Sequence, residues 1–440
     1  MLRSIMIISE RTYRFSYNLW LVVLGTSLIF RMPATLLLIL FAAFNLLFYK
    51  RMRFTKDRML IMALIATPFL LDLLFLSNNE SLAEGFKHAE KRLSLLILPV
   101  CLLSQTHRFN TAHVLRYYAW LTTLTLVICL LRFAWIEPEL FLKYLSGKDL
   151  WEMGYTFAKS TGNHAPALNM HMAFVVVINF YFLKEKVQNA KIRSIVLPLL
   201  FFIASVILLF YINTRLAITN AFFGIILVSL YQKAKLFDLN VLKKLGLGVL
   251  IFGVLGIGFI KLFPYSIQKF SSVTFAHIDK VGKLDELENP EETVFNSLVT
   301  RLSIWQSAFE VAKQHPFIGV GAADGKRELI RYFKTTNQQF LAKYEFPVHN
   351  QYLDFWIKFG VLGLITSLMY VSLFLYFGIK TRQVLCVFFF VLFASANTVD
   401  DFLIRFDGIV FSGLWLCFFA QAYVLNRESR KRGLDEQTHF

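Results

Sequence analysis

The sequence predicts an all-α polytopic membrane protein with about twelve transmembrane helices and one large outward-facing, partly helical loop. Two observations predict this fold class. Of the 440 residues, 56% are hydrophobic and 47 are phenylalanine, which is more apolar surface than most soluble folds bury. In addition, several uninterrupted apolar stretches reach the roughly 20 residues that are needed to cross a bilayer.

The predicted spans follow the apolar stretches in chain order. They are residues 17–31, 33–49, 59–76, 92–105, 114–135, 167–183, 194–212, 215–231, 245–263, 352–378, 383–399 and 407–425. This pattern divides the chain into an N-terminal transmembrane region (1–263, about nine spans), a large loop (264–351), a C-terminal transmembrane region (352–425, about three spans) and a tail (426–440).

The loops between the spans predict the orientation. Loops after even-numbered spans are basic, as in KRMRFTKDR (50–58) and KEKVQNAKIR (184–193), whereas those after odd-numbered spans carry fewer basic and more acidic residues. Basic loops stay preferentially in the cytoplasm. Both termini are therefore predicted to be cytoplasmic, and the 264–351 loop is predicted to lie outside the cytoplasmic membrane.

Charge and cysteine content argue against two classes of protein. The net charge of +17 could suit a nucleic-acid-binding protein, but many of the basic residues fall in the short loops, so we predict no nucleic-acid partner. The four cysteines, Cys101, Cys129, Cys386 and Cys417, lie within apolar runs and lack metal-site spacing. They predict neither a disulfide framework nor a zinc site.

The large loop is predicted to contain helices of its own. Helical spacing puts four apolar residues on one face of its middle segment: Leu298, Leu302, Trp305 and Phe309. This helix should end near His315, because the residue before a proline disfavours helical geometry. Asp324 should cap a second helix, and a third should begin after Asn350 and enter the membrane. A loop of about 90 residues with such helices is typical of a functional lid.

Two arginines are candidates for binding an anion. Arg215 lies in YINTRLAIT, between the seventh and eighth predicted spans at the outer surface, and Arg301 lies one helical turn before Trp305. The alternatives are an arginine that reaches the interface from a helix end and a solvated helical arginine. However, ionisable groups that border a helix bundle in a membrane tend to be partnered and functional.

His349 is the candidate general base. It precedes a helix whose predicted N-cap is Asn350, and the positive end of the helix dipole disfavours an imidazolium. A neutral imidazole can accept a proton near pH 7. The alternative, which the spacing supports equally, is a structural histidine that bonds to a backbone carbonyl.

Asn350 and four further residues are candidates for supporting roles. Lys91 and Arg92 enter the fourth predicted span from outside and could attract phosphate. Asp400 and Asp401 flank the last outer turn, where they could orient an arginine or bind an acceptor.

No metal site is predicted. His164 and His171 lie seven residues apart, but two histidines without a third ligand do not make a metal site. The outer loops also contain no D-x-D-type acidic pair. His164 remains a candidate supporting residue on the outer side.

Four segments together resemble the O-antigen ligase and polymerase family of bacterial membrane glycosyltransferases, which are GT-C-like. They are TR at an outer helix end, R-x-x-x-W, HPFIGVGAADG and HNQYLDFWIKFGVLG. The resemblance is specific over about 298–365 and rests elsewhere on span number, orientation and the position of Arg215. In this family, the arginines at the positions that resemble Arg215 and Arg301 and the histidine that resembles His349 are functionally important. The resemblance therefore implies the same for these three residues. It departs at the last outer turn, where Asp400 or Asp401 stands in place of the glutamate of many relatives.

The resemblance implies an enzyme of the bacterial cytoplasmic membrane whose active site faces the periplasm. Its donor would be a glycan linked through pyrophosphate to undecaprenol. Arg215 and Arg301 would bind the pyrophosphate, because the planar guanidinium makes bidentate bonds to phosphate. His349 would deprotonate or orient the acceptor hydroxyl. With two arginines supplying the positive charge, we predict transfer without a metal ion or other cofactor.

Three functions remain open. A ligase would transfer the glycan to lipid A–core, and a polymerase would transfer it to a second lipid-linked glycan. The ligase is favoured because only one outer loop is large. A lipid or polysaccharide transporter would predict charged residues near the bilayer midplane or an internal inverted repeat, and the sequence shows neither. Membrane lipids are predicted partners in every case.

Overall fold

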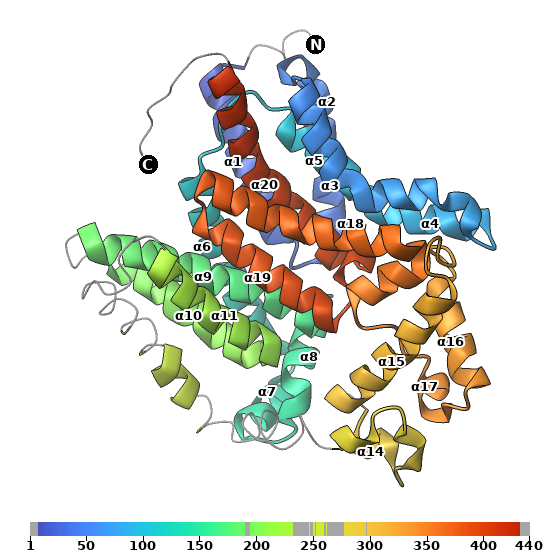
Figure 1. Cartoon of the computed structure of the whole chain (residues 1–440). Coiled ribbons are helices and arrows are strands. Elements are labelled where there is room, and N and C mark those ends of the chain that lie inside the picture. Colours follow the sequence, from blue (N-terminus) through green and yellow to red (C-terminus); the bar gives the residue numbers. More distant parts are fainter. Residues whose placement is uncertain are drawn as a thin grey trace.

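The computed structural model of the protein describes residues 8–189, 194–231, 246, 250, 252–258, 261, 277–295 and 297–431. All regular secondary structure in these residues is helical, and one isolated β-bridge joins Met52 to Gln105. The predicted all-α class is confirmed for this part of the chain (Figure 1).

The helices follow one another in four groups. The first group is α1 (Glu10–Ser27), α2 (Arg31–Leu47), α3 (Lys56–Leu74), α4 (Leu82–Arg92), α5 (Ser94–Leu103) and α6 (Thr111–Ile136). The second is α7 (Pro138–Leu145), α8 (Leu150–Ser160), α9 (Ala165–Asn189), α10 (Val196–Ile212) and α11 (Arg215–Tyr231). The large loop holds α14 (Pro290–Thr293), α15 (Leu298–Gln314), α16 (Gly325–Thr335) and α17 (Gln339–Tyr344). The last group is α18 (Gln351–Thr381), α19 (Val384–Val399) and α20 (Phe406–Lys431).

Four helices of the described chain are long and apolar enough to cross a membrane. They are Thr111–Ile136, Ala165–Val187, Gln351–Thr381 and Phe406–Arg430. Helices α2, α10, α11 and α19 are apolar but shorter. A helix of 17 residues, such as α10, is only about 26 Å long, which is less than the roughly 30 Å of the bilayer core. The count of about twelve spans therefore stays a prediction, and most of the predicted span 245–263 lies outside the described residues.

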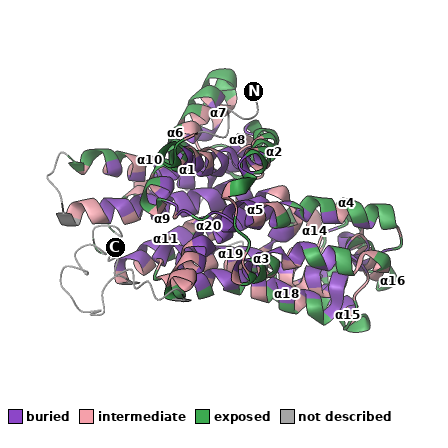
Figure 2. Ribbon diagram, turned by 90° about the horizontal axis from the view of Figure 1, so that it is seen from above, coloured by how far each residue is buried: buried purple, intermediate pink, exposed green. Residues whose placement is uncertain are grey.

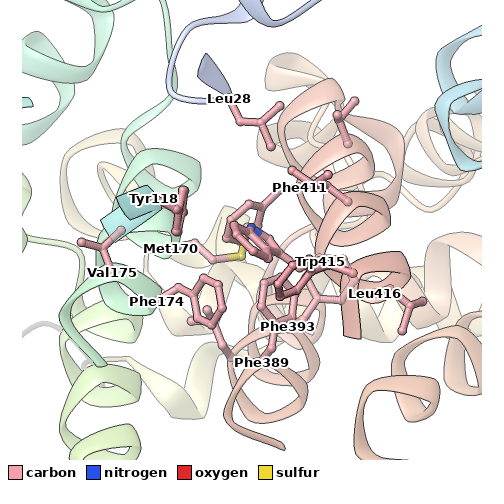
Figure 3. Close-up of a cluster of buried hydrophobic side chains, with 14 of the residues drawn as sticks. Leu28, Tyr118, Met170, Phe174, Val175, Phe389, Phe393, Phe411, Trp415 and Leu416 are labelled. Carbon is pink, nitrogen blue, oxygen red and sulfur yellow. The ribbon is translucent and has the colours of Figure 1, made fainter. Parts of the chain in front are cut away.

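The core lies where α6, α9, α19 and α20 meet. Trp415 of α20 packs against Tyr118 of α6 and Phe174 of α9, with ring centroids 4.6 and 5.4 Å apart, and Figure 3 shows Phe389 and Phe393 of α19 in the same cluster. Such aromatic pairs contribute about 0.5–1.5 kcal/mol each beyond the area they bury. Figure 2 shows α9 and α20 buried along most of their length, whereas α2 and α4 expose one face. This packing holds the turn between α19 and α20 from both sides.

The large loop has a second apolar core. Helix α15 ends at Gln314, as predicted from Pro316. The apolar face inferred from helical spacing is, however, not the buried one, because Phe309 is 43% exposed and Leu298, Leu302 and Trp305 are only partly buried. The buried face of α15, which packs against α16 and α18, contains Val299, Ile304, Ala308, Val311 and Ala312.

Two predicted helix starts have different outcomes. Helix α18 begins at Gln351, and the side chain of Asn350 accepts hydrogen bonds from the backbone N–H groups of Tyr352 and Leu353 at 3.0 and 3.1 Å. The predicted N-cap of α18 is thus confirmed. Asp324 precedes α16, but its side chain makes no cap bond and instead accepts from the backbone N–H of Glu80 at 2.8 Å. The predicted capping by Asp324 is therefore wrong.

Helix α18 is broken at Gly360, where φ is 64° and ψ is −156°. The turn after α15 pairs with the backbone at this break: the N–H groups of Val320 and Gly321 donate to the carbonyls of Ile357 and Lys358, each at 2.9 Å. The N–H of Val361 donates to the Pro316 carbonyl at 2.8 Å. A Cβ atom at Gly360 would lie 2.1 Å from the Phe317 backbone, so only glycine allows this approach. These bonds fix the start of α18 to the large loop.

Candidate active site

His349 lies where α15, α18 and α19 come together. Its carbonyl accepts a hydrogen bond from Nε1 of Trp305 at 3.2 Å. The side-chain amide of the following Asn350 donates to the carbonyl of Thr398 at 3.1 Å. The backbone of His349 is left-handed, with φ at 50°. This conformation costs a non-glycine residue about 1–3 kcal/mol and persists only where surrounding contacts impose it. The imidazole is therefore held in a set position.

A chain of polar side chains runs from His349 to His164. Nδ1 of His349 lies 3.5 Å from Oδ1 of Asp400. The same oxygen accepts from the guanidinium of Arg405 at 3.3 Å, and another nitrogen of Arg405 lies 3.4 Å from Nδ1 of His164. Asp400 and Arg405, from the turn between α19 and α20, thus link His349, just before α18, to His164, just before α9.

The two aspartates of this turn differ in their surroundings. Burial by itself raises the pKa of Asp400, but the hydrogen bond from His349 and the charge of Arg405 hold this pKa below its usual value. Asp401 is fully buried, and neither of its carboxylate oxygens has a hydrogen-bond partner within the described residues. Burial, together with the charges of Asp354 and Asp400, raises the pKa of Asp401 to about 7. Adjacent carboxyls with opposite shifts are typical of sites that hold and move protons.

Three arginines lie near Tyr155 of α8. This tyrosine is 48% exposed, and it interacts electrostatically with Arg301, Arg215 and Arg405, as well as with Asp400. Arg215 is the first residue of α11, and Arg301 lies in the first turn of α15. The positive ends of both helix dipoles add to the charge of the side chains. The resulting surface suits an anion with several oxygens.

Residues 200–368 match a family model described as O-antigen ligase. The match supports assigning this chain to the O-antigen ligase family. The matched range includes Arg215, Arg301 and His349 and ends before the turn that holds Asp400 and Arg405. No curated protein matches the chain.

The apolar helices of the described residues indicate an integral membrane protein. The polar cluster around His349 is thus the candidate active site of this chain, and His349 itself lies within the range that matches the O-antigen ligase model.

The other candidate residues lie apart from the cluster. Arg92 is buried in an ion pair with Asp72, with 2.5 Å between nitrogen and oxygen. It also donates to the carbonyl of Leu403 at 2.7 Å, so it supports the turn between α19 and α20 from behind. Lys91 is exposed on α4. His171 is buried in the core against Phe411, with 3.7 Å between ring centroids.

Sequence reasoning missed Arg405 and Tyr155. Arg405 follows Asp400 by five residues in the sequence DDFLIRFDG. The expectation that Asp400 and Asp401 could orient an arginine was the one signal for this residue. Tyr155 belongs to α8, for which no element was predicted. A solvent-exposed aromatic in a short helix carries no signal of its own, because single exposed apolar side chains are common.

One group of described residues has the composition of a metal site. His349, Asp400 and Asp401 each offer a ligand atom, and these atoms lie within 4.8 Å of one another. The residue types suit a divalent cation. The guanidinium of Arg405 nevertheless bonds to Asp400, and its positive charge disfavours a second cation beside it. The prediction of metal-independent chemistry therefore needs a direct test.

Proposed function

We propose that this chain is a glycosyltransferase that moves a glycan from an undecaprenyl-pyrophosphate donor to a hydroxyl of lipid A–core. The observation that carries this proposal is the juxtaposition of a histidine–carboxylate pair with several arginines. His349 lies 3.5 Å from Asp400, and Arg215 and Arg301 both act electrostatically on the exposed Tyr155, as Asp400 does. A base beside an anion-binding surface is what transfer from a pyrophosphate requires.

In this mechanism, Arg215 and Arg301 bind the donor pyrophosphate. The acceptor hydroxyl oxygen bonds to the anomeric carbon while the bond from that carbon to the pyrophosphate oxygen breaks. Negative charge then develops on the pyrophosphate, where bidentate guanidinium groups stabilise it more strongly than in the ground state. The glycan ends on the acceptor, and undecaprenyl pyrophosphate leaves.

His349 takes the proton of the acceptor hydroxyl. With Nδ1 directed at Asp400, the second ring nitrogen is available as the base, and the carboxylate stabilises the imidazolium that forms. The 3.5 Å separation is long for a hydrogen bond, and such contacts tighten when substrates bind. Arg405 keeps Asp400 ionised for this role.

The test of the proposal is transfer by the purified protein. The protein is given an undecaprenyl-pyrophosphate glycan with either lipid A–core or an excess of lipid-linked glycan as acceptor. A product on lipid A–core alone supports the ligase, and a product only on the lipid-linked glycan would make the chain a polymerase. Absence of transfer to both acceptors by monodisperse protein would contradict an enzymatic function and favour a transporter.

Transfer should survive excess EDTA with little loss. The physical reason is that Arg215, Arg301 and Arg405 supply the positive charge that a metal would otherwise bring. The measurement is the initial rate after EDTA treatment and gel filtration, with and without added magnesium or manganese. If activity vanished with EDTA and returned with the metal, the group of His349, Asp400 and Asp401 would become the metal site.

Residues 264–351 are expected to lie on the periplasmic side of the bacterial cytoplasmic membrane. A cysteine at Lys283, which is exposed, should react with a membrane-impermeant thiol reagent in cells with a permeable outer envelope. One at Lys186 should not. Because Cys129 is only partly buried, the background should carry Cys129→Ser. The opposite labelling pattern would reverse the orientation and remove the periplasmic mechanism.

A further inference from the structure

A basic pocket lies at the end of the molecule that the candidate active site does not use. Its volume is about 330 Å³, and its lining includes Tyr13, Lys50, Arg51, Arg53 and His107. The connection between α2 and α3 supplies the three basic residues, and the connection between α5 and α6 supplies His107. The two connections are joined by the bridge between Met52 and Gln105, so this is a built cavity rather than a gap between loops.

Positive charge is in excess in this pocket. Three basic side chains line it together with one carboxylate, that of Glu10. Arg51 pairs with Glu10 and lies 4.4 Å from the centroid of the Tyr13 ring. The side chains of Lys50 and Arg53 are exposed and make no hydrogen bond or ion pair within the described residues. Two cations are therefore available to a ligand.

His107 contributes a buried, tightly packed ring to the lining. The residue is 4% exposed, and its Nε2 has no hydrogen-bond partner within the described chain. Its ring packs edge-on against Tyr13 and Tyr17, with centroids 5.5 and 5.3 Å apart, so it is fixed in place.

Apolar side chains border the basic ones. Leu46 is 70% exposed, and Leu47, Tyr49 and Phe54 are also among the exposed large apolar residues. Tyr49 and Phe54 are direct neighbours of Lys50 and Arg53 in the sequence, and Leu46 and Leu47 precede Lys50 by about one helical turn. Exposed leucine and phenylalanine beside basic residues, with tyrosine between them, are typical of the membrane–water interface.

The pocket lies at the opposite membrane interface from the candidate active site. Arg53 acts electrostatically on Glu428, near the last turns of α20, whereas Arg405 precedes the first turn of the same helix. Helix α20 has 26 residues and is thus about 39 Å long, which exceeds the roughly 30 Å bilayer core. In Figure 1 the end of α20 lies at the top and α8 and α15 lie below.

We propose that this pocket binds the phosphate headgroup of an anionic glycerophospholipid. Lys50 and Arg53 contact the phosphate, and the acyl chains lie along Leu46, Leu47 and Phe54. Inorganic phosphate shares the headgroup chemistry, but it would leave the apolar border without a partner. The assignment depends on the membrane setting of the chain and not on the proposed glycan transfer.

The test is a lipid titration of the full chain in detergent, followed by native mass spectrometry. Phosphatidylglycerol should bind more tightly than phosphatidylcholine. The double substitution Lys50→Gln and Arg53→Gln should weaken phosphatidylglycerol binding roughly 10- to 30-fold, because each basic residue contributes about 1 kcal/mol to anionic lipid binding. Lys50→Arg with Arg53→Lys should retain it, which separates loss of charge from misfolding.

Lys326→Gln with Lys334→Gln is the matched control, because both lysines are exposed on α16 and the net charge changes equally. It should leave lipid binding unchanged. Equal affinity for the two lipids, or equal weakening in the control, would overturn the proposal. Inorganic phosphate that displaces phosphatidylglycerol only at molar concentration agrees with a lipid occupant. Tight phosphate binding without lipid preference would assign the pocket to a soluble anion instead.

Discussion

Replacing His349 with alanine is expected to reduce glycan transfer roughly 10²- to 10⁴-fold, the usual contribution of a general base. The donor should still bind, because the arginines that hold the pyrophosphate are intact. The loss should therefore appear in kcat, with little change in donor KM. The measurement is steady-state transfer at varied donor concentration by protein that remains monodisperse in detergent.

Two histidine controls sharpen this result. His113→Ala removes an exposed imidazole at the start of α6 and should leave transfer unchanged. His164→Ala should cost much less than His349→Ala, because His164 contacts Arg405 and takes no proton in the proposed mechanism. Near-normal transfer by well-folded His349→Ala protein would eliminate this residue as the base. Asp400, Asp401 and His164 would then be the remaining groups of the cluster that can take a proton.

Arg215→Lys and Arg301→Lys are each expected to reduce transfer on the order of 10- to 100-fold, or a few kcal/mol of transition-state stabilisation. Lysine keeps the charge but not the planar pair of donors that bonds two phosphate oxygens at once. The quantity to measure is kcat/KM for the donor. Because the lost bonds also hold the donor and strengthen as the pyrophosphate leaves, kcat should fall and the KM for the donor should rise.

Arg331→Lys is the matched control for these substitutions. Arg331 lies on α16 in an exposed ion pair with Glu328, and such pairs contribute little, so transfer should stay within about twofold. If Arg215→Lys and Arg301→Lys behaved like this control, the two arginines would act only as general positive charge. A larger role would then fall to Arg405, which already contacts Asp400.

The sequence predicted the local features of the fold well. The end of α15 depends on the geometry that Pro316 imposes on the residue before it. The start of α18 depends on the cap by Asn350, which bonds to residues within three positions. Both are set by neighbours in the chain. The cap by Asp324 failed because its carboxylate bonds to Glu80, which is far away in sequence. Likewise, the break at Gly360 depends on a turn that precedes it by some forty residues, and an apolar run gives no sign of it.

The candidate site was predicted in part for the same reason. His349, Arg215 and Arg301 stand at helix starts next to polar segments, where sequence patterns can be interpreted. The contact between Arg405 and His164 joins residues 241 positions apart, and no periodicity reports such a contact. Arg92 resembled a phosphate-attracting residue because it stands at a helix end. Its pairing with Asp72 inside the bundle becomes visible only when α3 and α4 are packed together.

The break in α18 has a mechanical consequence for the histidine at its start. Val320 and Gly321 bond to carbonyls before Gly360, whereas Pro316 accepts from Val361 after it. The turn thus bonds to α18 on both sides of the break and not to one side alone. Bending the helix at Gly360 would break hydrogen bonds on one side or the other. Tilting of the part of α18 after Gly360 is therefore transmitted to His349 as in an unbroken helix, although the helical backbone of α18 is interrupted at Gly360.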